Sequence, residues 1–321
     1  MRLTLLVPEL IWPEPNDQLT LGKLAAPGFE WLAAHAEFSR QPRRAFEHTL
    51  ADHFGLTDAP FGALRLLGET GKQQIEEGHW LCADPVHLRF HHERIVLADA
   101  GAFELELEEA HAITAALNSE FADIGRFHVA TARRWYLQLN ATVNEKFAPI
   151  STIAGRRLDS DLTDKNGPLK PAVNSVWLWG GGPLGDVPAP LFSAVCSDNP
   201  LATGLALAAG IEAPPCPASL STLLADSAPN DTPLVLLDTL LPPVLYENSD
   251  DWRNAFAALE RDWFVPLRAA LGGKIETLTI VAPTIYGQLT WTLHGKDRWK
   301  FWRKSRPLQA IAKELAEGTP Q

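Results

Sequence analysis

Apolar and polar positions alternate along this chain in a way that predicts short buried strands separated by amphipathic helices. Short apolar runs that stop at a turn-forming residue predict strands, and the first of them, Leu3–Val7, stops at Pro8. Apolar residues at helical spacing predict helices, most clearly from Leu105 to Phe121. Further expected strands are Arg133–Leu139, Ser175–Trp179, Phe192–Cys196, Leu234–Leu237 and Thr277–Val281, and further expected helices are Pro27–Phe38, Arg43–Phe54, Leu201–Ala209 and Asp251–Leu271, the last kinked at Pro266. This alternation of strands and helices predicts an α/β protein.

The middle of the chain has a different pattern. From Gly78 to Leu97 the residues favour β-structure, with a break at Asp84-Pro85 and a hairpin tip at His91–Arg94. Residues 159–172 are polar and contain Pro168 and Pro171, so they predict a connector between two lobes.

Composition narrows the class of protein. The 321 residues are 46% hydrophobic with a net charge of −11, which disfavours nucleic acid as a partner of the whole surface. No apolar run is long enough to span a membrane and no signal peptide is evident, so we expect a cytoplasmic location.

One segment of this acidic chain has a positive net charge. Residues 296–306 contain six basic residues and one acid, Asp297, so the segment carries +5 and the remainder of the chain −16. Trp299, Phe301 and Trp302 alternate with these cations, a composition used for stacking on bases or docking at an anionic surface. The aromatics could instead close the core, and we favour this second interpretation because the acidic remainder offers partners for the cations.

The run Asn174–Gly182 predicts a buried strand that ends in a glycine turn, with Trp177 and Trp179 on one face. Gly180, Gly181 and Gly182 could form an anion-binding nest or a lid, or simply a tight turn beside the indoles. Pro183 forbids the helix that a dinucleotide-binding loop requires.

Several motifs, in this order, resemble the archaeal-type cofactor-independent phosphoglycerate mutases of the alkaline phosphatase superfamily. A bacterial group, the RpfE-type regulatory proteins, is the closer match. The motifs are Gly55–Asp58, Glu108–Ala110 with Leu117-Asn118, Arg134–Leu137, Asn174–Gly182 and Leu259–Leu267. The resemblance implies an alkaline-phosphatase-like, doubly wound and mostly parallel sheet from residues 1–69 and 166–321, with an inserted smaller α+β lobe at residues 70–165.

The resemblance also implies a two-metal site with a phosphoryl-carrying serine, and this chain keeps only part of it. Glu9 and Asp238 are the remaining candidate metal ligands, because the other expected ligands are replaced, for example at Leu240 and Pro283. An ungapped comparison places Phe46 at the nucleophile. Thr49 is the nearest hydroxyl and would need a shift of register.

Arg134 corresponds to an arginine that contacts substrate phosphate in the family, and the histidine that follows it there is Trp135 here. A guanidinium is the usual bidentate ligand of a phosphate. Arg134 could equally be a surface residue or the partner of an acid.

Three hypotheses follow. The first is a pseudoenzyme without a cofactor that binds a small phosphorylated ligand or a protein partner in a regulatory role. The second is an active phosphoglycerate mutase or related phosphotransferase that uses one or two divalent metals, Mn, Mg or Zn, around Glu9, Thr49, Asp238 and Arg134. The third is a scaffold that binds a partner through the basic aromatic segment.

Overall fold

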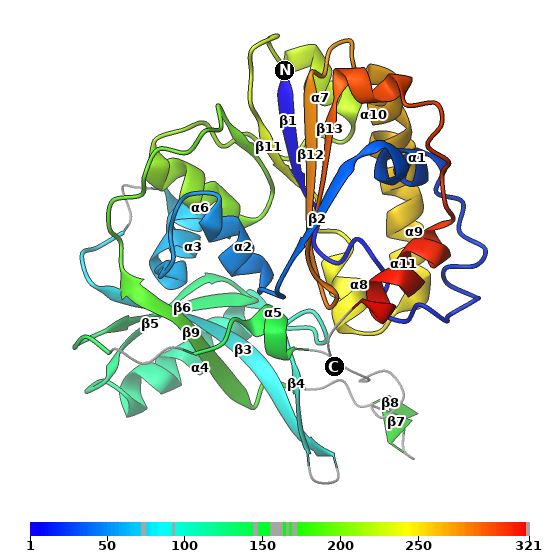
Figure 1. Cartoon of the computed structure of the whole chain (residues 1–321). Helices are drawn as coiled ribbons and strands as arrows, with labels where there is room; N and C mark the ends of the chain where they lie inside the picture. The colour runs from blue at the N-terminus through cyan, green and yellow to red at the C-terminus, as the bar shows by residue number, and fades with distance from the viewer. Residues whose placement is uncertain are drawn as a thin grey trace.

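A six-stranded sheet organises the larger part of the molecule (Figure 1). The computed structural model describes residues 1–71, 75–91, 94–143, 147–154, 163–164, 167–168 and 172–318. In spatial order the strands of this sheet are β10 (Val195–Cys196), β11 (Leu234–Leu236), β1 (Arg2–Leu6), β12 (Thr277–Thr284), β13 (Gly287–His294) and β2 (Glu37–Gln41). The first four strands are parallel, whereas β13 and β2 are antiparallel to their neighbours.

Both faces of the sheet are covered, which explains why its central strands are almost continuously apolar. In β1, Leu3 and Leu5 point into one core while Leu6 points into the other. The first core is shared with α1 (Pro27–His35), α7 (Leu220–Asp226), α8 (Leu241–Leu245), α9 (Ser249–Leu259), α10 (Val265–Ala270) and α11 (Leu308–Glu317). The second is shared with α2 (Phe46–Asp52), α3 (Phe61–Thr70) and α6 (Pro200–Ala209).

A second sheet is wholly antiparallel and packs below the second core (Figure 1). Its strands are β3 (His79–His91), β4 (Arg94–Ala98), β5 (Gly125–Thr131), β6 (Arg134–Leu139) and β9 (Ser175–Pro183). It is accompanied by α4 (Leu107–Glu120), the short α5 (Ile150–Ile153) and the two-stranded pair β7 (Thr163–Asp164) and β8 (Gly167–Pro168). The molecule is therefore a mixed α/β protein with parallel and antiparallel sheets.

The second core joins the two sheets. Leu6 and Leu234 of the large sheet belong to the same buried cluster as Trp80, Tyr136 and Trp179 of the second sheet. Trp177 packs against this cluster from the same strand as Trp179, as predicted.

Most predicted strands and helices are confirmed, but several boundaries are wrong. The strand expected from Phe192 begins at Val195. The helix expected from Arg43 begins at Phe46. The helix expected to reach Phe38 ends at His35, because Phe38 belongs to β2 and lies opposite Trp291 of β13. β12 continues past Val281 to Thr284 and returns directly as β13.

Asp84-Pro85 does not break its strand. β3 continues through both residues, which pair with Trp177 and Val176 of β9. Pairing with β6 stops at Cys82 and pairing with β4 starts at His87, so Pro85 lies where β3 is paired on one edge only. A strand tolerates the missing N–H of proline at such an unpaired edge.

The long helix expected at Asp251–Leu271 is interrupted before Pro266. Five residues, Glu260–Phe264, form a π-helical turn between α9 and α10. Pro266 has no N–H to donate to the preceding turn, which favours an interruption at this point. The Glu260 carboxylate accepts hydrogen bonds from the N–H groups of Gly28 and Phe29 and so caps α1.

The glycine run does not end its strand either. Gly180, Gly181 and Gly182 lie within β9, where Trp80 pairs with Gly182. A Cβ atom at Gly180 would approach the Cβ of Phe61 to 2.5 Å, so this position brings β9 against the start of α3.

The expectation that the basic segment closes the core with its aromatics is wrong. Trp299, Phe301 and Trp302 are 68%, 87% and 65% exposed. The segment is a 3-10 turn, Gly295–Trp299, followed by an exposed loop, and the core is closed beyond it by Leu308 and Ile311 of α11.

The predicted lobe boundary between residues 165 and 166 lies outside the described residues, as does residue 92 at the predicted hairpin tip. The division into lobes therefore stays a prediction. Within the part of the chain that the structure describes, no helix is long and apolar enough to cross a bilayer.

Candidate functional site

A cleft of about 570 Å³ lies between the carboxyl end of β11 and the second sheet. Helices line one part of it, namely the start of α2, the middle of α3 and the start of α6. The β5–β6 turn of the second sheet and the loop after β11 of the large sheet line the rest. Of the residues singled out from the sequence, Arg134 and Asp238 both line the cleft. Phe46, the first residue of α2, lines it too.

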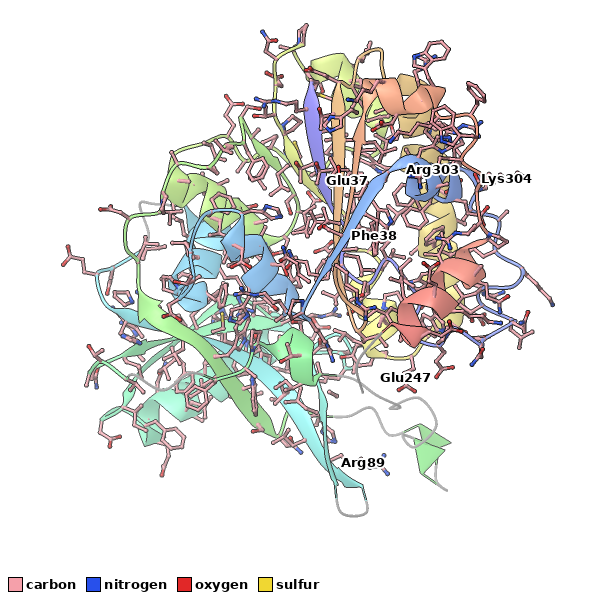
Figure 2. The ribbon with its side chains drawn as sticks, in the orientation of Figure 1. Glu37, Phe38, Arg89, Glu247, Arg303 and Lys304 are labelled. Atoms are coloured by element: carbon pink, nitrogen blue, oxygen red, sulfur yellow. The ribbon has the colours of Figure 1, made fainter. Side chains whose placement is uncertain are left out.

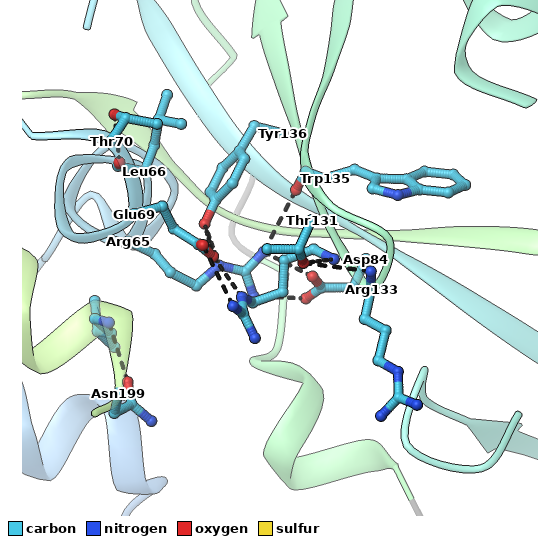
Figure 3. A network of polar contacts seen from close by, with 12 residues as sticks. Arg65, Leu66, Glu69, Thr70, Asp84, Thr131, Arg133, Trp135, Tyr136 and Asn199 are labelled. Carbon is cyan, nitrogen blue, oxygen red and sulfur yellow. Dashed lines mark hydrogen bonds and ion pairs between the residues drawn. The ribbon is translucent and has the colours of Figure 1, made fainter. Parts of the chain in front are cut away.

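A buried ion pair forms the floor of this cleft (Figure 3). The Arg65 guanidinium donates to both carboxylate oxygens of Asp84, over 3.0 and 2.6 Å, and its Nε donates to the Tyr136 hydroxyl over 3.0 Å. The Trp179 indole N–H also donates to Asp84, over 2.7 Å. Burial alone would lower the pKa of Arg65, but Asp84 holds that pKa well above its ordinary value. Arg65 and Asp84 therefore neutralise each other.

Two consecutive arginines lie at the β5–β6 turn. Arg134 forms an ion pair with Glu69 through its Nε and Nη2 groups, yet its side chain is 41% exposed. Arg133 lines the cleft as an exposed residue and extends away from the polar network in Figure 3. Its side chain makes no hydrogen bond or ion pair with the residues that the structure describes. Cationic donors are thus available on this wall.

Asp238 follows β11 and faces the start of α6. The Asn199 side-chain Nδ2 group donates to it over 3.0 Å, while the side-chain Oδ1 atom of Asn199 caps α6 by accepting from the Leu201 N–H. Burial raises the pKa of Asp238, against the lowering effect of the Asn199 hydrogen bond, and Asp198 nearby raises it further.

A second acid with a perturbed pKa is Glu47. It is buried, and the Ser151 hydroxyl of α5 donates to it over 2.6 Å. Burial raises the pKa of Glu47, and the hydrogen bond from Ser151 only partly offsets this effect. Glu47 is adjacent to Phe46, so an acid and a phenyl ring stand where the resemblance implies a nucleophile.

Glu9, Thr49 and the glycine run are not among the residues that line the cleft. The fully buried Thr49 hydroxyl donates to Gln288 of β13 over 3.2 Å. The Glu9 Oε2 atom is buried without a hydrogen-bond partner among the described residues, and burial raises the pKa of Glu9 to about 7 while Arg43 lowers it. The roles predicted for these residues stay predictions.

The residues present do not fit the two-metal centre that the resemblance implies. Such a centre needs several carboxylates and histidines converging on one point. Among the described residues, no three side chains of His, Cys, Asp or Glu are grouped so as to hold a metal ion. Glu9 and Asp238 follow neighbouring strands, β1 and β11, but no described interaction connects them.

The sequence patterns missed Arg65, Asp84, Glu47 and Asn199. A signal existed for the first two, because each is a charged residue within an otherwise apolar run, Phe61–Leu67 and Trp80–Val86 respectively. Two charges buried in a core require pairing. The partnership of α3 with β3 depends on tertiary packing, which the patterns do not give.

Comparisons with known proteins concern the fold alone. No protein-family model matches the chain, and no curated protein matches it. Among solved structures, the PH0037 protein from Pyrococcus horikoshii is similar with a TM-score of 0.54 and 12% identity, over 99% of this chain and 95% of that one. A cofactor-independent phosphoglycerate mutase from Thermoplasma acidophilum is similar with a TM-score of 0.50 and 14% identity, over the full length of both chains. The chain therefore has a fold similar to that of a cofactor-independent phosphoglycerate mutase.

Proposed function

We propose that this chain is a pseudoenzyme that binds a small phosphorylated ligand in the cleft, with the phosphate held by Arg134 and Arg133. In this proposal the protein has an alkaline-phosphatase-like, doubly wound core with an inserted lobe, and acts as a regulatory protein of the RpfE type. The observation that carries the proposal is the pair of available guanidinium groups on one wall of a cleft shared by two sheets.

Some N–H groups of the Arg134 guanidinium remain available to a ligand. Glu69 takes two of the five N–H groups of this guanidinium, and the exposed part of the side chain leaves the others for a ligand. Arg133, the neighbouring residue at the β5–β6 turn, adds a second guanidinium to the cleft lining, and this one has no side-chain partner among the described residues. Two such groups match the several oxygens of a phosphate ester.

The acids around the cleft are compatible with an anion. Asp84 is neutralised by Arg65, and the Tyr246 hydroxyl donates to Asp99. Because burial raises the pKa values of Glu47 and Asp238, these two carboxyls take up protons more readily than exposed acids do. A protonated carboxyl can donate a hydrogen bond to a phosphate or carboxylate oxygen.

Two observations support binding without turnover: Phe46 at the position of the nucleophile, and the absence among the described residues of a group of acids and histidines that could hold a metal. A phenyl ring cannot accept a phosphoryl group, and the nearby Thr49 hydroxyl is committed to Gln288. The competing proposal is an active mutase or phosphotransferase, and the retention of Asp238 at the end of β11 is the observation that favours it.

Isothermal titration with 3-phosphoglycerate tests the proposal. We expect saturable binding by the unmodified protein and none of glycerate, which lacks the phosphate. Arg134→Gln and Arg133→Gln should each weaken binding about tenfold or more, because a hydrogen bond to a charged group contributes about 1.5–3 kcal/mol.

Arg126→Gln is the matched control, since Arg126 is an exposed arginine on β5 that does not line the cleft. Its affinity should equal that of the unmodified protein. Equal affinities for all three variants, or binding of glycerate as tight as that of its phosphate ester, would contradict the proposal.

A further inference from the structure

The loop between β13 and α11 exposes its aromatic residues together. Trp299, Phe301 and Trp302 are each at least 65% exposed, although all nine other tryptophans are buried or half-buried. Adjacent exposed aromatics on a single loop are characteristic of a binding surface rather than of scattered surface residues. We define these three residues with the cations of 296–306 as the aromatic loop.

Three of the six cations of the aromatic loop have no side-chain partner among the described residues. Lys296, Arg303 and Lys304 are exposed and form no ion pair or side-chain hydrogen bond within the part of the chain described. The one acid, Asp297, is buried, pairs with Lys300 over 2.9 Å and accepts from the His294 N–H. The loop therefore presents positive charge and exposed rings on a protein whose remainder is strongly negative.

A hollow beside the loop extends the cationic surface. It has a volume of about 290 Å³ and lies between α1, β2 and α11, with Arg303, Lys304 and Arg306 on its rim. Figure 2 shows Arg303 and Lys304 next to α1, at the outer margin of the molecule. Both acids of the hollow are engaged, because Glu30 accepts from the Leu308 N–H and Glu314 pairs with Arg306. Arg303 and Lys304 therefore line this hollow as cations without a side-chain partner among the described residues.

The ring geometry disfavours single-stranded nucleic acid. Successive bases stack on aromatic faces that lie roughly parallel. Phe301 and Trp302 stand edge to face at 80°, and the Arg298 guanidinium already covers a face of Trp299, 5.2 Å from its ring centre. An interface between lipid headgroups and acyl chains makes no such demand on ring angles, and it accepts tryptophan flanked by lysine and arginine.

We propose that the aromatic loop docks this protein on the surface of anionic lipid bilayers, with Trp299, Phe301 and Trp302 inserted at the headgroup level and Lys296, Arg303 and Lys304 bound to lipid phosphates. The association is peripheral and electrostatic in its first step. It is independent of the ligand proposed for the cleft.

Co-sedimentation with vesicles tests this proposal. We expect binding to phosphatidylcholine vesicles that contain about one third phosphatidylserine, and at least tenfold weaker binding to vesicles of phosphatidylcholine alone. Raising the salt from ~0.1 to ~0.5 M should also weaken binding several-fold, because the charges are exposed and screened.

Two variants separate rings from charges. The triple variant Trp299→Ala, Phe301→Ala, Trp302→Ala and the triple variant Lys296→Gln, Arg303→Gln, Lys304→Gln should each lose at least tenfold in affinity. All six side chains are exposed, so both variants should keep the far-ultraviolet circular dichroism of the unmodified protein. A matched control combines Leu191→Ala with Lys23→Gln, which remove an exposed apolar side chain and an exposed cation elsewhere, and it should bind as the unmodified protein does.

Equal binding by the unmodified protein and both triple variants would overturn the proposal. It would also be overturned by tight binding of a single-stranded oligonucleotide or an acidic peptide with no binding of vesicles. Loss of a dimer in the ring variant, without vesicle binding by the unmodified protein, would assign the loop to self-association instead.

Discussion

At the scale of the residue, the buried carboxyl of Glu9 makes the stability of the fold depend on pH. Glu9 follows β1 with a left-handed backbone, φ 56°, and the Trp252 indole donates to its carbonyl oxygen over 3.1 Å. Burial raises its pKa from 4.5 to about 7, so the folded protein binds this proton more tightly than the unfolded chain does. The resulting stabilisation is complete below pH 4.5 and is lost as the pH rises through 7.

Glu9→Gln should therefore matter mainly at high pH. We expect the variant to exceed the unmodified protein in free energy of unfolding by about 1–3 kcal/mol at pH 8, and to differ far less at pH 5. Urea unfolding at both pH values measures this difference, with the exposed Glu14→Gln as control. A Glu9→Gln effect of the same size at both pH values would show that the carboxyl is not held protonated by burial.

At the scale of the elements, α3 and α6 cross with their backbones in close approach. A Cβ atom at Gly68 would lie 1.7 Å from the carbonyl oxygen of Pro200, and one at Gly204 would lie 1.7 Å from that of Leu64. Only glycine permits this approach of two helix backbones. The crossing also fixes Arg65 on α3 relative to Asn199 at the start of α6, two parts of the cleft.

Gly68→Ala and Gly204→Ala should each lower the free energy of unfolding by at least about 2 kcal/mol, because overpacking outweighs the helix propensity gained. Gly185→Ala is the control, since a Cβ atom there meets nothing within 4 Å. Chemical denaturation compares the three variants. A loss no larger than that of Gly185→Ala would mean that the helices separate at little cost.

Elements with a marked pattern could be predicted from the sequence, and elements without one could not. The continuous apolar runs of β1, β11 and β12 reflect burial on both faces of the large sheet. β2 has no such pattern because four of its five residues are exposed, at the edge of the sheet. The interruption before Pro266 follows from the missing N–H of proline, but neither the π-helical form of the turn nor the contact of Glu260 with α1 has a signal in the apolar pattern.

At the scale of the whole molecule, the two sheets share one buried cluster. Since Leu6, Leu234, Tyr136 and Trp179 belong to it, neither sheet can unfold without exposing the core of the other. The cysteines of this chain are free, and the buried Cys82 and Cys196 report on the second and the large sheet respectively.

We therefore expect each thiol to become reactive only as the whole molecule unfolds in urea. Pulsed thiol labelling of Cys196→Ser and Cys82→Ser variants, each also carrying Cys216→Ser, measures the two midpoints separately. Each midpoint should match that of the variant's own circular dichroism transition. If the Cys82 midpoint fell well below the circular dichroism midpoint of the same variant, the second sheet would unfold as a separate unit.

The site could be predicted only in part, because the direction of its side chains depends on the packing of the whole molecule. Arg134 and Asp238 were expected at a site and line the same cleft, although they come from different sheets. The patterns gave no means of seeing that Thr49 faces Gln288, or that Glu47 reaches Ser151 across 104 residues of sequence. Side-chain direction within a known helix depends on the register of its packing, which is a property of the whole fold.

Phosphorus nuclear magnetic resonance of 3-phosphoglycerate with the unmodified protein and Mg²⁺ tests the central claim most directly, since one spectrum reports both binding and conversion. We predict a shifted or broadened phosphate resonance that is restored by Arg134→Gln, with no new phosphorus resonance after prolonged incubation. A growing 2-phosphoglycerate resonance that Asp238→Asn abolishes would contradict the claim of binding without turnover. A phosphate resonance unaffected by the protein would contradict the claim of binding itself.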